Sequence, residues 1–177
     1  MKRSLSILFA ALFCLSGCGY TTKSLLPEDI KSIHIPPTIN GIDLTAEVSD
    51  KKPFRVYRPG LEVDVTNAII DRFIFDGHLR VATQANADAQ TEIRLVDYRR
   101  DPLRFNSNDD VQEYRLTVTV DMRVFRTRDN TTLWSARMGG DSTFFLSGPR
   151  AVSEDEATRQ AVEDLARRVV DKTIELW

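Results

Sequence analysis

The chain has 177 residues, of which 42% are hydrophobic and 28% are charged, and its formal net charge is −2. This length fits one domain that can bury a sizeable core. The near-neutral charge argues against a dedicated nucleic-acid binder, although it leaves room for local basic patches.

The first residues have the composition of an export signal. Lys2 and Arg3 precede an apolar run over residues 5–15, which is too short to span a bilayer comfortably. The sequence then reads Ser16-Gly17-Cys18, and together with Leu15 it resembles the bacterial lipobox, in which the cysteine is acylated and becomes the mature N-terminus. An ordinary secretory peptide with an incidental cysteine is the alternative. We expect a signal peptide over 1–17 and lipidation at Cys18.

The anchor would then be lipid alone. Cleavage before Cys18 removes Cys14, so the mature chain keeps one cysteine and no internal disulfide. Several acyl chains, palmitate among them, contribute about 0.8 kcal/mol per buried CH₂ and anchor a protein stably. Gly19 stands where the Gram-negative lipoproteins that this N-terminus resembles commonly carry an Asp for inner-membrane retention. We therefore expect attachment to the outer membrane on its periplasmic side, with a tether over residues 18–29.

The mature chain opens with little regular structure. Residues 30–35 alternate as a short strand, which Pro36 and Pro37 end because proline cannot donate to a ladder. Residues 38–58 are polar and irregular and predict a long surface loop, with residues 54–57 touching the sheet edge. The only two histidines, His34 and His78, lie far apart, so no metal site is expected.

An amphipathic helix is predicted over residues 61–76. Its apolar residues recur at three- and four-residue spacing, Glu62 and Asp64 lie in the first turn, and Gly77 is placed to end it. Strands are expected over 79–82 and 91–100. In the second of these, the alternation puts Ile93 and Leu95 on one face and Val96 and Tyr98 on the other. A loop is predicted over 101–110.

The longest alternating stretch follows, over residues 112–126. Even-numbered residues from Tyr114 to Val124 are apolar and odd-numbered ones are largely polar, which predicts a central antiparallel strand roughly 50 Å long. A turn over 127–131 leads to a returning strand over 132–146, where Gly139-Gly140 suggests a bulge or bend.

The last predicted element is a helix that starts at Ser153, with Glu156 completing a capping box. Two amphipathic helices and one sheet with a single apolar face predict an α+β, two-layer sandwich. We expect a mainly antiparallel four- to five-stranded sheet with two helices on one face, forming a single domain over 30–177.

No motif or residue cluster in the sequence indicates catalysis or a cofactor. Phosphate-binding loops, zinc-protease motifs, nucleophile elbows and clustered Cys or His are absent. Asp109-Asp110 and Glu154-Asp155-Glu156 would allow a glycosidase or a cation site. Each of these runs has a local reason, however, as turn or helix-start residues. The chain is therefore predicted not to be an enzyme.

Arginines gather at one predicted end of the sheet. If the strands before and after residues 101–110 are antiparallel, that loop shares its end with residues 146–152. The shared end would carry Arg99, Arg100, Arg104 and Arg150 with Leu103 and Phe105. Arginine binds phosphate well, and a mixed apolar and cationic surface suits an acidic amphiphile. The alternative is a set of solvated arginines partly neutralised by Asp101, Asp109 and Asp110.

An ordered set of segments resembles the lipopolysaccharide-assembly lipoprotein family, LptE. They are residues 15–20 (LSGCGY), 33–36 (IHIP), 59–68 (PGLEVDVTNA), 76–81 (DGHLRV), 97–100 (DYRR), 113–116 (EYRL), 133–134 (LW) and 161–170 (AVEDLARRVV). No one segment is highly specific, but together they follow the family along nearly all of the mature chain. Residues 41–54 look like an insertion.

The resemblance implies an outer-membrane lipoprotein that sits inside the LptD β-barrel, helps it assemble, and helps deliver lipopolysaccharide to the cell surface. Basic residues on loops at one end of the family's sheet contact lipopolysaccharide, and Arg104 and Arg150 occupy broadly corresponding loops. The family's fold, a sheet with two helices on one face, agrees with the prediction above.

Two other classes remain open. The first is a periplasmic protein-binding accessory lipoprotein of another envelope lipid transporter or of a cell-wall synthase. The second is a hydrolase that uses surface carboxylates. Co-purification with a large β-barrel would separate the LptE-like function from the first, and the absence of a concave carboxylate pair would dismiss the second.

Overall fold

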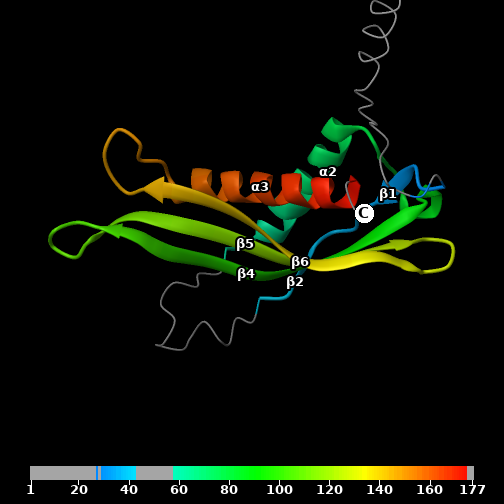
Figure 1. The fold of residues 1–177 in the computed structure, drawn as a ribbon, viewed down its shortest axis with the longest axis horizontal. Helices are drawn as coiled ribbons and strands as arrows, with labels where there is room; N and C mark the ends of the chain where they lie inside the picture. The colour runs from blue at the N-terminus through cyan, green and yellow to red at the C-terminus, as the bar shows by residue number, and fades with distance from the viewer. Residues whose placement is uncertain (1–26, 28, 43–57, 175–177) are drawn as a thin grey trace, which may run out of the picture.

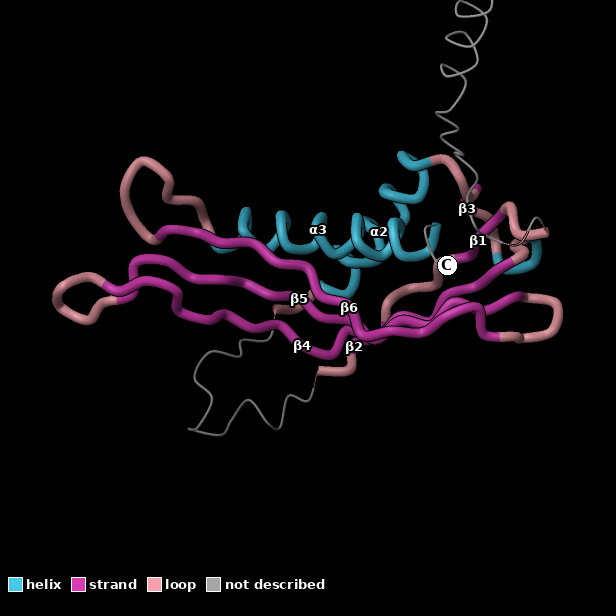
Figure 2. Tube along the Cα trace, in the orientation of Figure 1, coloured by secondary structure: helices cyan, strands magenta, loops and turns pink. Residues whose placement is uncertain are grey.

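The computed structural model describes residue 27, residues 29–42 and residues 58–174. It is the predicted α+β sandwich, with one mixed but largely antiparallel sheet and two helices on one face (Figures 1 and 2). The sheet has six strands in the order β3-β1-β4-β5-β6, with β2 paired to β4. The strands are β1 (Ser32–His34), β2 (Ile39–Asn40), β3 (Arg80–Val81), β4 (Ala89–Phe105), β5 (Val111–Arg126) and β6 (Thr132–Phe145). The helices are α2 (Leu61–Asp76), the 3₁₀ turn η1 (Gln84–Asn86) and α3 (Glu154–Ile174).

The predicted central strand is confirmed as β5. It pairs antiparallel with β4 on one side and with β6 on the other along nearly its whole length. Its even-numbered residues from Leu116 to Val124 are buried beneath the helices. Its odd-numbered residues therefore lie on the opposite side of the sheet, which is called the open face below.

Strand β4 differs from the prediction in two ways. The register with β5 shifts between Leu95 and Asp97, so Val96 is an extra residue and Tyr98 joins Ile93 and Leu95 on the buried face. The strand also continues past Arg100 through residues that we predicted as loop. Its pairing with β5 runs on to Phe105, with two further register shifts after Pro102. Proline cannot donate a hydrogen bond to the neighbouring strand, which is why it is tolerated in irregular pairing near a strand's end.

The helix boundaries follow the predicted signals closely. Gly77 takes a left-handed conformation (φ 77°) and donates its N–H to the Phe73 carbonyl, which ends α2. At the start of α3, the Ser153 hydroxyl accepts the Glu156 N–H at 3.1 Å, as predicted. The Glu156 carboxylate does not close a capping box, because it pairs with Arg159 and Gln160 on the next turn.

Of the bulge or bend expected at Gly139-Gly140, the bulge is not present. The β5–β6 register is unbroken there, and the need for glycine comes instead from the helix above. A Cβ atom built on Gly140 would lie 2.6 Å from the Leu165 Cβ and closer still to the Ala161 carbonyl oxygen and the Leu165 N–H of α3. Gly140 therefore lets the backbone of α3 approach the sheet.

The short strands β1, β2 and β3 lie on the side of β4 that faces away from β5. β1 pairs in parallel with β3 and β4, and the short β2, in a stretch predicted as loop, pairs in parallel with β4. The predicted signal peptide, Cys18, most of the tether and residues 43–57 of the expected loop and insertion lie outside the described residues. Among the described residues, no helix is long and apolar enough to cross a membrane.

Candidate functional site

The turn over residues 106–110 and the loop over residues 146–153 lie at one end of the sheet, here called the loop end. Both are seen at the end opposite the 127–131 hairpin (Figures 1 and 2). This shared end is what the antiparallel order of β4, β5 and β6 predicted. Arg104, near the end of β4, and Arg150, in the loop over residues 146–153, therefore lie at the same end of the sheet.

A row of three side chains crosses the open face at this end. Arg104 on β4 is opposite Glu113 on β5, and Glu113 is opposite Phe145 on β6. The Arg104 Nε lies 3.5 Å from a Glu113 carboxylate oxygen, and its guanidinium carbon lies 5.8 Å from the centre of the Phe145 ring. The Glu113 side chain is 13% exposed and that of Arg104 is 59% exposed. Arg104 therefore keeps most of its surface for a ligand.

Arg150 reaches the same aromatic ring from the loop. Gly148 adopts a left-handed conformation (φ 88°) and accepts the Ala151 N–H at 3.0 Å. An isolated bridge between Phe145 and Ala151 then lays the loop along β6. The Arg150 guanidinium carbon lies 4.5 Å from the centre of the Phe145 ring. Two arginines from separate elements therefore meet at Phe145.

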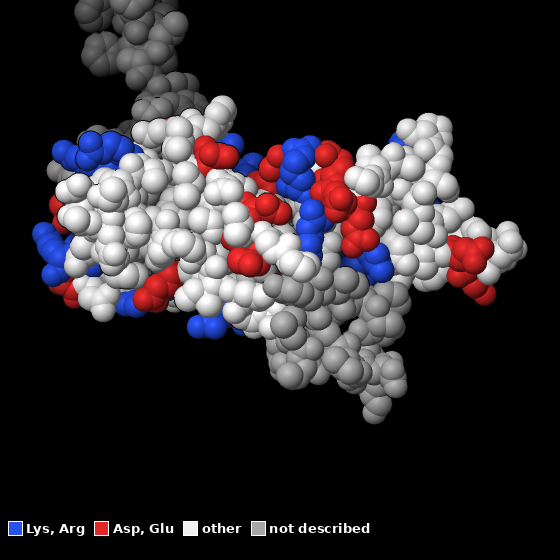
Figure 3. All heavy atoms as spheres, turned by 180° about the vertical axis from the view of Figure 1, so that it is seen from behind, with Lys and Arg blue, Asp and Glu red and all other residues white. Residues whose placement is uncertain are grey.

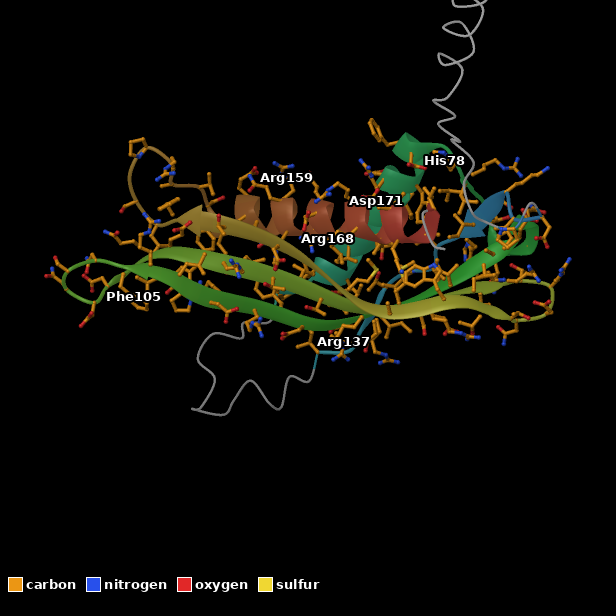
Figure 4. All side chains as sticks on the ribbon, in the orientation of Figure 1. His78, Phe105, Arg137, Arg159, Arg168 and Asp171 are labelled. Atoms are coloured by element: carbon orange, nitrogen blue, oxygen red, sulfur yellow. The ribbon has the colours of Figure 1, made fainter. Side chains whose placement is uncertain are left out.

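Exposed apolar side chains lie at the same end of the sheet as this pair of arginines. Phe105 is 53% exposed, and it is labelled near the end of the sheet in Figure 4. Three further large apolar side chains at the loop end are exposed, namely Leu103, Leu146 and Val152. Half of the eight exposed large hydrophobic residues in the described chain lie here, which marks a candidate binding surface.

Arg99 and Arg100 point to opposite sides of β4. Arg99 lies opposite Thr117 on the open face, and its Nε donates to Asp101 at 2.7 Å. Arg100 lies opposite Leu116 on the helix side, where it donates to the Glu154 carboxylate at 2.6 Å. Arg100 therefore belongs to the contact between sheet and helix and does not join Arg104 and Arg150.

A polar cluster forms around Glu154 beneath the first turn of α3. The Tyr98 hydroxyl donates to Glu154 at 3.1 Å and lies 3.1 Å from the Thr158 hydroxyl oxygen. Burial, aided by the nearby Glu154 carboxylate, raises the pKa of Tyr98 above its ordinary value, so the hydroxyl keeps its proton at neutral pH.

The carboxylates that would allow hydrolysis or cation binding have local partners. Asp110 accepts a hydrogen bond from the Asn106 side chain within its own turn, and Asp155 pairs with Arg58 at 2.7 Å. No group of three or more potential metal ligands comes together in the described part of the chain. Asp110 and Asp155 therefore have structural roles, in a turn and in an ion pair.

Away from the loop end, a groove lies between the two helices. This groove of ≈ 960 Å³ is lined by charged residues of both signs from α2 and α3. Seen from behind in Figure 3, acidic and basic side chains lie intermingled across the molecule. The groove therefore presents no field of one sign that would select a ligand by charge.

Sequence reasoning missed Phe145 and Glu113. The adjacent pair Phe144-Phe145 at the end of a strand held the signal, because neighbouring residues on a strand face opposite sides. Phe144 is buried and stacks on Tyr114 with ring centres 5.7 Å apart. Phe145 is therefore left on the open face, where the arginines meet it.

A family model described as "LptE: Lipopolysaccharide-assembly" matches residues 31–174. No curated protein sequence matches the chain. The solved structure of the hypothetical protein CT253 from Chlamydia trachomatis is 12% identical, with a TM-score of 0.55 over 81% of this chain and 95% of that one.

Two further solved structures have similar scores. XCC0632 from Xanthomonas campestris is 12% identical, with a TM-score of 0.51 over 82% of this chain and 84% of that one. PelC from Paraburkholderia phytofirmans, described as a dodecamer, is 12% identical, with a TM-score of 0.50 over 88% of this chain and 96% of that one. At this identity, the three structures share the fold alone.

Proposed function

Because the chain belongs to the LptE family of lipopolysaccharide-assembly proteins, we propose that it is an outer-membrane lipoprotein that supports the LptD β-barrel and binds lipopolysaccharide at its loop end. The observation that carries the ligand assignment is the meeting of Arg104 and Arg150 at Phe145. The partner assignment rests on the family.

The chemistry of the loop end matches that of an acidic amphiphile. Lipid A carries phosphates beside acyl chains, so it needs cationic and apolar surface within one small area. Arg104 and Arg150 offer guanidinium groups that bind phosphate oxygens in pairs. Phe105 and its exposed apolar neighbours offer the surface for acyl chains.

The expected strength of these contacts depends on how far the ligand removes them from water. A charge-assisted hydrogen bond contributes about 1.5–3 kcal/mol when it is partly desolvated. Fully exposed ion pairs contribute only roughly 0–1 kcal/mol, but the Glu113 side chain is largely shielded and Arg104 is the exposed partner. A phosphate can therefore bind the exposed part of the Arg104 guanidinium while Glu113 stays in place.

We expect Arg104→Glu combined with Arg150→Glu to weaken lipopolysaccharide binding by about tenfold or more, since each charge-assisted contact is worth about 1.5–3 kcal/mol. Both sites are on the surface, so the fold should be unchanged. Binding by the parent should also weaken with added salt, because salt screens phosphate contacts. The measurement is a lipopolysaccharide titration of the full chain, purified in a mild detergent, at two salt concentrations.

The matched control makes the same change of charge elsewhere on the sheet. Arg123→Glu with Arg137→Glu alters two arginines of the open face that lie far from the loop end. Figure 4 labels Arg137 near the middle of the sheet. The control should bind lipopolysaccharide within about twofold of the parent, because only long-range, screened charge effects remain. Equal affinity of the loop-end variant and the parent would remove these arginines from the site and leave barrel support as the function.

We also propose that the chain is anchored through acylated Cys18, with a signal peptide over 1–17, a tether over 18–29 and a single domain over 30–177. The lipobox-like Leu15-Ser16-Gly17-Cys18 supports this. We expect Cys18→Ser to leave the precursor unprocessed or to release the chain from membranes, because serine cannot form the thioether. Membrane fractionation with a test for precursor processing measures this. Normal processing and outer-membrane retention of the variant would refute the anchor.

A second surface favours a protein partner, which both the proposed function and its alternative require. On α2, Val63 and Ile74 are exposed on the side away from the core, and the neighbouring Phe75 is 80% exposed. The alternative is an accessory lipoprotein of another envelope lipid transporter or of a cell-wall synthase. A detergent pull-down of the native chain separates the two. A large β-barrel in the eluate supports the LptD assignment, and a different transporter or a synthase supports the alternative.

A further inference from the structure

Arg100 lies between the sheet and the first residue of α3. Its guanidinium donates to the Glu154 carboxylate at 2.6 Å, and its guanidinium carbon lies 4.9 Å from the centre of the Tyr114 ring. The Arg100 side chain is only 26% exposed. The ion pair is therefore partly shielded and is held on an aromatic surface, which makes it stronger than an exposed pair.

The partners of Arg100 are themselves fixed to the core. Tyr114 stacks on the buried Phe144 of β6. Glu154 accepts a second hydrogen bond from Tyr98, whose hydroxyl also meets Thr158 one turn along α3. Two side chains of β4 therefore bind Glu154, and one of them, Arg100, rests on an aromatic pair from β5 and β6.

A second contact ties the same helical turn to β6. The Ser142 hydroxyl donates to the Ala157 carbonyl at 2.6 Å. The loop over residues 146–153 follows the end of β6 and leads into α3 at Glu154. The hydrogen bond from Ser142 to Ala157 therefore holds the strand before the loop close to the helix after it. This loop carries Arg150, whose place over Phe145 depends on both ends being held.

Arg100 is poorly placed to bind a ligand at the loop end directly. It lies on the helix side of β4, whereas Arg104 and Phe145 lie on the open face. Releasing it would also leave Glu154 partly shielded without its cation, which costs more than an exposed pair does.

We propose that Arg100 is a positioning residue for the loop-end site, which through Glu154 fixes the start of α3 and so holds Arg150 against Phe145. The proposal rests on the proposed function for the ligand, but the contact itself exists without one. Arg100, which the sequence places with the binding arginines, therefore orders the site, whereas Arg104 and Arg150 touch the ligand.

The experiment is a double-mutant cycle on the full chain, using Arg100→Gln, Glu154→Gln and both together. If Arg100 acts through Glu154, each single variant and the double variant should weaken lipopolysaccharide binding equally, by about three- to tenfold, because coupled changes do not add. If Arg100 binds the ligand itself, Arg100→Gln alone weakens binding while Glu154→Gln does not, which would overturn the proposal.

A second measurement needs no ligand. Amide hydrogen exchange at Ala151, whose N–H bonds the Gly148 carbonyl, should be about fivefold faster or more in both single variants, since local contacts set local opening. Arg100→Lys, which keeps a charge that can reach Glu154, should restore part of the protection. Unchanged exchange in Arg100→Gln would overturn the proposal.

The matched control is Arg137→Gln, which breaks an ion pair of similar length, 2.7 Å, with Asp121 on the open face. It should leave both exchange at Ala151 and lipopolysaccharide binding unchanged. If the parent chain fails to bind lipopolysaccharide, the proposed function fails. The exchange comparison still decides whether Arg100 orders the loop.

Discussion

Gly140→Ala is expected to destabilise the chain by about 3 kcal/mol or more, because overpacking against backbone atoms exceeds the usual 1–3 kcal/mol cost of added core methyl groups. The new methyl group would lie 2.6 Å from the Leu165 Cβ and closer to two backbone atoms of α3. A backbone cannot rotate away as a side chain can, so the helix must move off the sheet. Thermal unfolding followed by circular dichroism should give a melting temperature roughly 6–12 °C lower.

The neighbouring glycine is the matched control. A Cβ atom on Gly139 would find its nearest atoms at 3.8 Å, which is ordinary contact, and it points to the open face. Gly139→Ala should therefore change the melting temperature by no more than about 2 °C, and the lower chain entropy of alanine in the unfolded state favours a slight gain. Equal losses in the two variants would mean that strand conformation, and not the approach of α3, requires glycine here.

The fold could be predicted from the sequence where one pattern ran for many residues. The alternation of β5 fixed its two faces, and the helix signals placed α2 within its observed bounds. Both patterns depend on local geometry, since a side chain's direction follows from its position in the strand or helix. The predicted turn over residues 127–131 is likewise confirmed between β5 and β6.

The sequence could not reveal features that depend on contacts between elements. The extra residue at Val96 moved Tyr98 to the buried face, and this shift is established by the pairing of β4 with β5. The pair Gly139-Gly140 correctly marked a special backbone position, but the cause lies in α3, more than twenty residues later in the chain. Parallel pairing of β2 with β4 likewise joins distant segments.

The sequence predicted which end of the sheet carries the candidate site, but not which side chains meet there. Antiparallel connectivity alone brings Arg104 and the loop of Arg150 to one end of the sheet. It does not say on which side of the sheet an arginine lies, and the shift at Val96 decides that Arg99 lies on the open face and Arg100 on the helix side. The pair Phe144-Phe145 held the signal for an aromatic residue on the open face, but only the contacts with Arg104 and Arg150 identify Phe145 as their shared partner.

Val118→Asp is expected to be the most harmful single change of charge in the sheet. Val118 is fully buried and lies between Tyr98 on β4 and Gly140 on β6, where the backbone of α3 packs closely against the sheet. No cation lies beside it in those pairings. An unpaired buried carboxylate costs about 3–5 kcal/mol, a large part of a domain's roughly 5–15 kcal/mol. Urea unfolding at pH 7 should show this loss or a failure to fold.

The pH dependence of that loss separates buried charge from simple loss of packing. Burial raises the pKa of an introduced carboxyl above its unfolded value, so the folded state holds its proton more tightly than the unfolded state does. Stability of Val118→Asp relative to the parent should therefore recover as pH falls from 7 towards 4. Ser135→Asp, which places a carboxylate opposite Arg123 on the open face, should stay within about 0.5 kcal/mol of the parent, as surface changes usually do. A parent-like Val118→Asp would mean that the register of β5 is displaced by one residue, since such a slip carries every side chain to the other face.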